Sequence, residues 1–284
     1  MATSKDTSKP SSRAETSSSN LLEQVEMLRV AAKKRSDAEP AQLDMWPSDL
    51  RALPNESARS ALFTVRRGKR RYYADEPILV LGDGELTYRG QELRTEDEDV
   101  WLQILHLARE QPLEEWIEFT PYALLKSLGW PTNKTYYNRL REALSRMKAT
   151  ALTAKSKRLG EGGLVLSLIA KFAWENEGQA LEKWRVWIDR EMRAFFGKTS
   201  YTQLIWESRK KLGPVAKRLM DYFSSHRNPY PIKSDQLRDL CGSETASIRK
   251  WRQLLSRALD ELEAIGFLTE WAFDEHDRVC VTRA

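Results

Sequence analysis

Apolar residues recur every three or four positions in the last third of the chain, which is the period of an α-helix with one buried face. The clearest stripe runs from Ile248 to Leu262, and Gly266 is a helix stop. The apolar segments after it predict a hairpin. The stripe consists of Ile248, Trp251, Leu255, Leu259 and Leu262, and the expected elements are helices at about 202–212, 214–225, 234–241 and 247–265, with strands at 267–273 and 278–282.

The same order of elements is predicted in the middle of the chain. Thr95 with the acidic run 96–99 suits a helix start, and Thr120-Pro121 suits a second one. Helices separated by a turn and followed by hairpin strands are the order of a winged helix. The expected elements are helices from 95, from 120 to 128 and from 134 to about 149, then strands at 152–155, 164–174 and 184–189.

A repeat in the sequence itself supports an internal duplication. Residues 140–149 and 255–264 both read L-x-x-A-L-x-x-[ML]-x-A, at an offset of 115 residues. Turn glycines at Gly129 and Gly242 precede the two copies in the same order. Matching motifs within matching element orders predict two copies of one structural unit.

Length and composition agree with two folded domains. The chain has 284 residues, of which 41% are hydrophobic and 31% charged, and a domain usually takes about 100–200 residues. We predict an α+β fold of two tandem winged-helix domains, 62–190 and 197–284, after a largely disordered tail at 1–61. No apolar run approaches the ~18 residues that cross a bilayer, and the N-terminus lacks the apolar core of a secretory signal, so a cytoplasmic protein is expected.

Residues that would support catalysis or metal binding are missing or scattered. No phosphate-binding loop GxxxxGK[ST] occurs, and His106, His226 and His276 are far apart in the sequence. Two cysteines are too few for a disulfide framework or a four-cysteine zinc site. The acidic groups at 97–99 and 114–115 are interpreted as solvated charge. We therefore expect no enzyme activity, no metal and no cofactor.

Positive charge is concentrated in two separate regions. Residues 132–158 hold eight Lys or Arg and one Glu, and residues 205–258 hold twelve Lys or Arg and five acidic residues. Two basic regions predict two contacts with a polyanion. The predicted DNA-binding residues are Ser247, Arg249, Lys250, Arg252, Gln253, Arg257 and Arg278 in the second domain, and Lys134, Asn138, Arg141, Lys155, Lys157 and Arg158 in the first.

These residue types suit DNA for two reasons. Arg pairs bidentately with guanine and Gln or Asn with adenine, while basic residues on a wing suit phosphates. The alternative is that these residues form a basic helix face that is only solvated and binds nothing. Charge alone does not show which of the two helices contacts the bases. Trp184 and Trp187 are interpreted as core residues.

Residues 36–60 are polar, contain Pro40, Pro47 and Pro54 and are interpreted as a linker with one apolar island. Gln42-Leu43-Asp44-Met45-Trp46 is similar to the Gln-Leu-x-Leu-Phe motifs that dock into the bacterial sliding clamp, with Met for Leu and Trp for Phe. All five residues are predicted to bind the clamp. The alternative is that this segment packs on its own domain.

The tandem winged helices, the duplication and the QLDMW segment together resemble the iteron-binding initiators of theta-replicating plasmids, most closely those of broad-host-range IncP plasmids in their shorter form. The resemblance covers the whole chain. It implies binding of directly repeated origin sequences (iterons) as a monomer, with dimers held inactive. It also implies opening of an AT-rich region, recruitment of the host initiator protein, replicative helicase and sliding clamp, and control of copy number.

By the same resemblance, the C-terminal domain makes the main sequence-specific contacts, and the first domain adds contacts and forms the dimer interface. Basic faces with nearby aromatic residues also suggest binding of single-stranded DNA from the opened origin. A winged-helix transcriptional repressor is the main rival, although a repressor gains nothing from a clamp contact. A nickase needs a histidine-metal site that the sequence lacks, and a partition adaptor would bind DNA without opening it.

Overall fold

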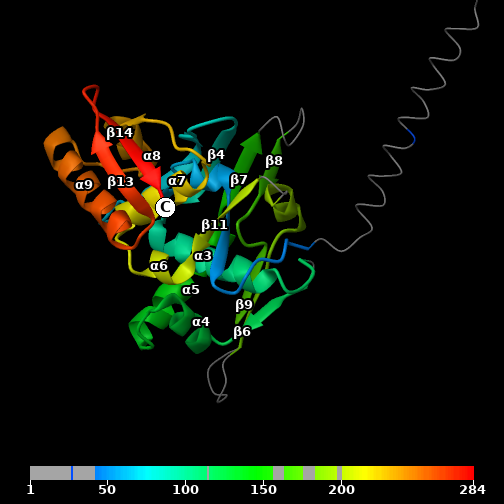
Figure 1. Ribbon diagram of the computed structural model, residues 1–284. Coiled ribbons are helices and arrows are strands. Elements are labelled where there is room, and N and C mark those ends of the chain that lie inside the picture. The colour runs from blue at the N-terminus through cyan, green and yellow to red at the C-terminus, as the bar shows by residue number, and fades with distance from the viewer. Residues whose placement is uncertain (1–26, 28–41, 114, 156–162, 175–182, 197–199) are drawn as a thin grey trace, which may run out of the picture. The chain divides into compact units, whose positions relative to one another are not determined.

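A computed structural model of the chain (Figure 1) describes residues 27, 42–113, 115–155, 163–174, 183–196 and 200–284. The chain divides into two compact units, 1–40 and 41–284, and the fold below is that of the second. Of the tail predicted at 1–61, residues 1–26 and 28–41 fall outside the described residues, as do the predicted DNA-binding residues Lys157 and Arg158. Among the described residues, no helix is both long and apolar enough to cross a bilayer.

The first module, here called the N-terminal module, has three helices and a three-stranded antiparallel sheet. Pro121 and the Thr120 side chain start the second helix, and Gly129 ends it in a left-handed conformation with φ of 70°. The first strand pairs with the last, so the sheet order is β6-β10-β9. The elements are α3 (Thr95–Ala108), β6 (Ile117–Phe119), α4 (Pro121–Leu128), α5 (Lys134–Lys148), β9 (Lys171–Trp174) and β10 (Trp184–Trp187).

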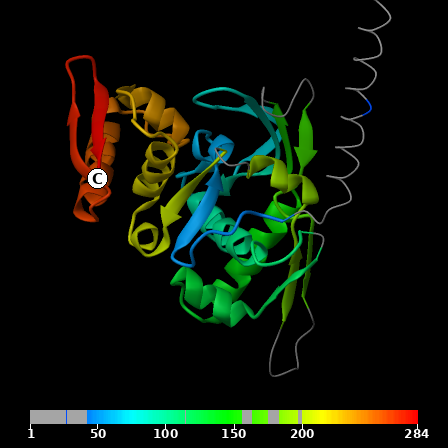
Figure 2. The same ribbon diagram turned by 45° about the vertical axis from the view of Figure 1, so that its right-hand side comes forward.

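The C-terminal module repeats this order (Figure 2). Its first strand again pairs with its last, giving the sheet order β12-β14-β13. The repeated motif occupies the same buried face in both modules, since Leu140, Ala143, Leu144 and Met147 of α5 and Leu255, Ala258, Leu259 and Leu262 of α9 are all buried. The elements are α7 (Pro214–Ser224), β12 (Ile232–Lys233), α8 (Ser234–Leu240), α9 (Ile248–Ala264), β13 (Leu268–Phe273) and β14 (Arg278–Arg283).

A second sheet interrupts the N-terminal module and corrects the predicted wing. The segment 164–174, expected as one strand, forms two strands that belong to different sheets. Between them lies Ser167, whose side chain donates a hydrogen bond to the Thr150 carbonyl (2.7 Å). Lys155 therefore lies in the second sheet rather than on the hairpin of β9 and β10. That sheet has the order β3-β4-β7-β8 and comprises β3 (Tyr72–Ile78), β4 (Glu85–Gln91), β7 (Ala151–Lys155) and β8 (Leu164–Leu166).

The segment from residue 42 to residue 61 is part of the folded body, so its prediction as a linker was wrong. Strand β1 (Leu50–Pro54) pairs antiparallel with β11 (Tyr201–Ile205). Most of β11 lies where a helix was predicted, at about 202–212. Helix α2 (Asn55–Ala58) follows directly. Three prolines and many polar residues suggested a linker. The partner strand of β1 lies about 150 residues away in the sequence, so residues near β1 give no indication that it pairs. The remaining short elements are β2 (Phe63–Thr64), β5 (Leu93–Arg94), the 3-10 helix η2 (Arg190–Phe195) and α6 (Trp206–Lys210).

A buried cluster of charged side chains joins the two modules. Arg209 of α6 donates to Glu98 (2.8 Å) and Asp99 (3.2 Å) of α3 and also bonds Asp221 of α7. Arg218 of α7 donates to Glu98 (2.7 Å) and Asp221 (3.0 Å). Both arginine side chains are fully buried. The interpretation of residues 97–99 as solvated charge was therefore wrong.

Arg218 also fastens the segment that follows β1. Its second terminal nitrogen donates to the carbonyls of Ser60 (2.6 Å) and Ser57 (3.2 Å). A third contact, to the carbonyl of Ala58, measures 3.4 Å. One guanidinium thus binds α3, α7 and the N-terminal segment together.

We predict that Arg218→Ala destabilises the protein by about 3–5 kcal/mol, because it leaves Glu98 buried without one of its two cationic partners. Urea unfolding followed by tryptophan fluorescence measures the change. The exposed Arg227 provides the matched control, and Arg227→Ala should change the free energy of unfolding by about 0.5 kcal/mol or less. Equal stability of the two variants would contradict the role given to the cluster.

Candidate nucleic-acid interface

Helix α9 buries one face and presents the other as a basic surface. Trp251 is fully buried, and its indole N–H donates to the Ser234 carbonyl (2.6 Å), which fixes α9 against α8. The Ser247 side chain caps the helix by accepting from the Lys250 amide (3.4 Å). Ile248 was predicted in the buried stripe, yet 47% of it is exposed. It occupies the first turn of the helix, beyond the edge of the core.

The predicted reading residues of α9 do lie together on its exposed face. A groove of about 800 Å³ separates this face from Phe273 of strand β13. Arg249, Lys250 and Arg257 are exposed and make no ion pair with any described residue. These free cations are available to an anionic ligand. The groove is lined by Ile248, Arg249, Arg252, Gln253, Ser256, Arg257 and Phe273.

Two other predicted contacts of the C-terminal module are already paired within the protein. Arg252 forms an ion pair with Asp277 (2.9 Å) and lies over the Phe273 ring at 4.4 Å. The Arg278 side chain donates to Asp274 (2.6 Å), four residues away in the same hairpin. Carboxylates of the loop between β13 and β14 therefore hold both arginines, and an anionic ligand would have to compete with these partners.

Helix α5 presents a similar but weaker surface. Lys134, Asn138 and Arg141 are exposed, and Arg141 donates to the Asn138 side chain (3.2 Å). Asn133 caps the helix by accepting from the Tyr136 amide (3.2 Å). The structure thus brings the three predicted residues of α5 together on one face, away from its buried stripe. Lys155 lies apart from them, on β7.

The segment Gln42–Trp46 is docked rather than free, which corrects the expectation of an exposed motif. Leu43 and Trp46 are each only 3% exposed. The Trp46 indole N–H donates to Nδ1 of His106 (3.2 Å), and its ring stacks on Phe196 with 6.0 Å between centroids. Gln42, Asp44 and Met45 are exposed. The two side chains that a clamp motif would insert are thus already inserted into this protein.

Burial also decides the charge state at this docking site. The pKa of His106 is lowered to about 3 by burial and by the nearby charges of Arg51 and Arg109. His106 is therefore neutral near pH 7, which it must be in order to accept the Trp46 hydrogen bond at Nδ1.

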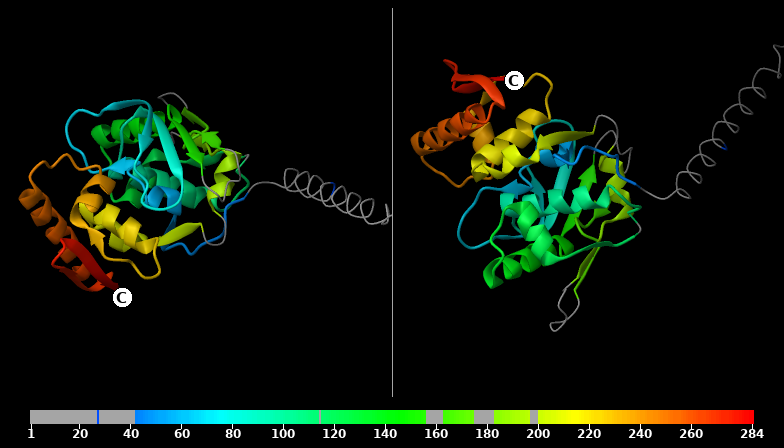
Figure 3. Two further views of the ribbon diagram at one scale, coloured as in Figure 1. Left: turned by 90° about the horizontal axis from the view of Figure 1, so that it is seen from above. Right: turned by 60° about the horizontal axis from the view of Figure 1, so that its bottom comes forward.

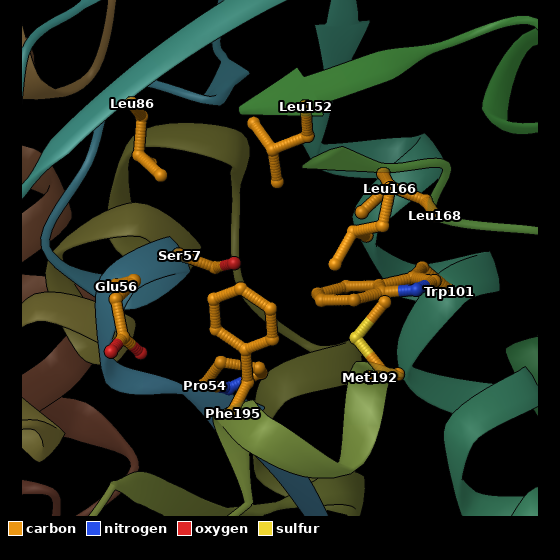
Figure 4. A pocket seen from close by; sticks show the side chains of 10 residues that line it. All are labelled: Pro54, Glu56, Ser57, Leu86, Trp101, Leu152, Leu166, Leu168, Met192 and Phe195. Carbon is orange, nitrogen blue, oxygen red and sulfur yellow. The ribbon is translucent and has the colours of Figure 1, made fainter. Parts of the chain in front are cut away.

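One apolar pocket of the N-terminal module is too small for a ligand. The pocket between α3 and η2 (Figure 4), beside Trp101, Met192 and Phe195, has a volume of about 10 Å³, whereas ligand pockets span about 300–1,000 Å³. No group of three or more potential metal ligands occurs among the described residues. Burial raises the pKa of Cys241 to about 12, so this thiol is protonated at neutral pH.

Taken together, fold and surface define an α+β chain with two modules of one topology, each presenting an exposed basic helix. A family model described as "TrfA protein" matches residues 14–283. The chain belongs to the TrfA family, which confirms the resemblance to plasmid initiators.

A curated relative and two solved structures are also similar. The plasmid replication initiator protein TrfA of Escherichia coli is 42% identical over 235 residues, which cover 81% of this chain and 61% of that relative. This chain therefore matches about three fifths of the relative's length. A crystal structure of selenomethionine derivatives of domains 2 and 3 of RctB has a TM-score of 0.56 at 13% identity, over 81% of this chain and 98% of that one. A second structure of RctB domains 2–3 has a TM-score of 0.53 at 10% identity, over 79% and 96%.

We predict that Trp46→Ala lowers the free energy of unfolding by about 3–5 kcal/mol, the usual cost of removing a buried tryptophan. Met45→Ala is the matched control, since the neighbouring Met45 is 65% exposed. This substitution should change the free energy of unfolding by about 0.5 kcal/mol or less. Thermal and urea unfolding of both variants measure the difference. If Trp46→Ala were as stable as the wild type, the docking of this segment would be refuted.

Proposed function

We propose that this protein initiates plasmid replication by binding directly repeated duplex sequences at the origin, acting by binding and not as an enzyme. Both modules serve as winged helices. The observation that carries this proposal is the presence of two exposed basic helices in equivalent positions of two modules, in a chain of the TrfA family. The similarity to a plasmid replication initiator supports the biological setting, a bacterial cytoplasm.

Helix α9 is the best candidate for base readout. Its N-terminal half carries the free cations Arg249, Lys250 and Arg257, while Asp260 and Glu263 lie exposed toward its C-terminal end. A helix with this polarity enters a major groove by its N-terminal end, where Arg can pair with guanine and Gln253 with adenine. Helix α5 also carries exposed cations without an ion pair among the described residues, Lys134, Arg141 and Lys148, and we assign it a supporting contact.

Strand opening would follow from binding energy. The sequence contains no phosphate-binding loop, so nucleotide hydrolysis in this chain is not required by the proposal. Several copies on adjacent repeats would bend the duplex, at a cost of the order of 1–6 kcal/mol, and favour melting of a neighbouring AT-rich segment. Recruitment of the host initiator and replicative helicase, and copy control by self-association, complete the proposed role.

Sliding-clamp binding by Gln42–Trp46 remains part of the proposal, under one condition. Leu43 and Trp46 would have to leave their sites on this protein before they could enter the clamp. Docking and clamp binding are then mutually exclusive, and the apparent affinity of the whole chain is lowered by the fraction of chains that are released.

Footprinting across the origin of the plasmid that encodes this protein, with permanganate in the same samples, tests the main function. We expect regularly spaced protection and reactive thymines in a neighbouring AT-rich segment. Arg249→Ala and Lys250→Ala should each weaken specific binding by ~1–3 kcal/mol if the side chain reaches a base. Lys211→Ala is the control, because Lys211 is exposed on α6's C-terminal side. Protection of a single operator without reactive thymines would favour a repressor.

The clamp proposal is tested by comparing a peptide of residues 38–50 with the whole chain. The peptide should bind the purified bacterial clamp more tightly than the chain does, because nothing competes for its Trp46. His106→Ala removes the hydrogen-bond acceptor of the docked Trp46 and should raise the affinity of the chain toward that of the peptide. A peptide that does not bind, or a chain that binds as tightly as the peptide, would count against this picture.

A further inference from the structure

A second basic element lies outside both basic helices. The basic loop, defined here as Arg66 to Arg71, follows β2 and precedes β3, and five of its six residues are Arg or Lys. Gly68 has φ of +80°, and no other atom lies within 4 Å of where its Cβ would be. A glycine in this conformation makes a sharp turn that other residues adopt rarely. The tip of the loop is therefore a turn that projects into open space.

One end of the basic loop is fixed to the turn that leads into α9. The Val65 amide donates to the Cys241 carbonyl (2.9 Å), and Arg66 Nε donates to the Gly242 carbonyl (3.0 Å). Arg66 also lies 3.4 Å from the Glu244 carboxylate. The loop is thus held beside the turn between α8 and α9.

The other end of the basic loop is fixed beside α5. Arg70 donates to Glu96 (2.7 Å) and Asp97 (2.6 Å) at the start of α3. Arg139 of α5 pairs with the second oxygen of the same Glu96. The loop (Figure 3) therefore runs from the turn that precedes α9, which Arg66 contacts, to the acidic start of α3, which Arg70 contacts and which also binds Arg139 of α5.

Only part of the positive charge in the loop is used for this attachment. Arg66 and Arg70 are paired as described, and Arg71 bonds Glu76. Arg67 and Lys69, on either side of Gly68, are exposed and form no hydrogen bond or ion pair with the part of the chain that the structure describes. The tip therefore carries two uncompensated positive charges.

The basic loop lies on the flank of α9 that is opposite the wing. Leu254 of α9 lines a groove of about 400 Å³ together with Val65 and Arg67. Ser256, two residues further on, lines the groove that contains Phe273 of the wing. Residues two apart on a helix project about 200° from each other. A duplex held against the exposed face of α9 would thus meet the wing on one side and the basic loop on the other.

We propose that Arg67 and Lys69 bind phosphates of duplex DNA, in the stretch of backbone between the sites contacted by α9 and by α5. This inference rests on the proposed function, since it takes α9 as the helix that enters the groove. The ligand is the phosphodiester backbone, because the loop lies on the flank of α9, where the strands that border an occupied groove would run, and cations placed there bind phosphate oxygens. The contact strengthens binding and fixes the register of the protein on DNA.

The test is the salt dependence of duplex binding by the full chain carrying Arg67→Ala and Lys69→Ala. Loss of two phosphate contacts should reduce the slope of log Kobs against log[salt] by about 1.8, at about 0.9 for each phosphate. Affinity should fall roughly 10- to 100-fold at 0.1 M salt, for origin repeats and for unrelated duplex alike. In ethylation interference, the double variant should no longer be sensitive to ethylation of the phosphates between the α9 and α5 contacts.

Two control variants distinguish an effect of the position of the two charges from an effect of net charge. Lys211→Ala with Arg227→Ala removes the same charge at exposed positions outside the basic loop and the basic helices, one after α6 and one after α7, and should leave the slope unchanged. The exchange Arg67→Lys with Lys69→Arg keeps both charges and should bind as the wild type does. Unfolding in urea should be the same for all variants, since neither tip residue is attached to the fold.

The outcomes separate this inference from the proposed function. A double variant with an unchanged slope overturns the loop contact, even if the wild type protects origin repeats. A slope reduced equally by the Lys211 and Arg227 control also overturns it, because the effect would then be one of net charge. If the wild type has no preference for repeats, the proposed function fails, while the slope on unrelated duplex still decides whether the loop binds phosphate.

Discussion

The buried cluster of Glu98, Asp99, Arg209, Arg218 and Asp221 is the constraint on which the rest of the structure depends. Desolvation of these charges costs several kcal/mol for each ion, and only close hydrogen-bonded pairing offsets it. Each guanidinium bonds at least two carboxylates. Because the partners come from α3, α6 and α7, a change in the relative position of the modules would leave a buried charge unpaired.

This constraint extends to the functional surface. Helix α3 carries Glu98 in the cluster and, in the same turn, Glu96 and Asp97, which bind Arg70 of the basic loop and Arg139 and Arg146 of α5. The acidic start of α3 therefore positions both basic elements of the N-terminal module. The same helix holds α7 through Glu98, and α7 packs against α9. One acidic turn thus sets the spacing between the surfaces that we assign to DNA.

Local sequence patterns predicted what is local in this fold. The stripes of α5 and α9, the helix start at Thr120-Pro121 and the glycine stop at Gly129 depend on neighbours within a few residues. The acidic run at 96–99 satisfies the rule for a helix N-terminus equally well whether it is solvated or buried. The buried partners of Glu98 and Asp99 lie more than 100 residues away. For the same reason β1 looked like a linker, and Trp46 looked exposed.

Counting charges along the sequence overstated the surface available to DNA. Residues 205–258 contain twelve Lys or Arg, yet Arg209 and Arg218 are buried and Arg252 is paired with Asp277. A charge that is neutralised inside the protein adds little to the attraction of a polyanion, since the field depends on the uncompensated charges. Three free cations lie together on α9 and two at the tip of the basic loop beside it, while others, such as Lys134 of α5 and Lys211 after α6, lie elsewhere on the surface. The neighbouring groups on α9 and the loop should therefore attract a polyanion most strongly.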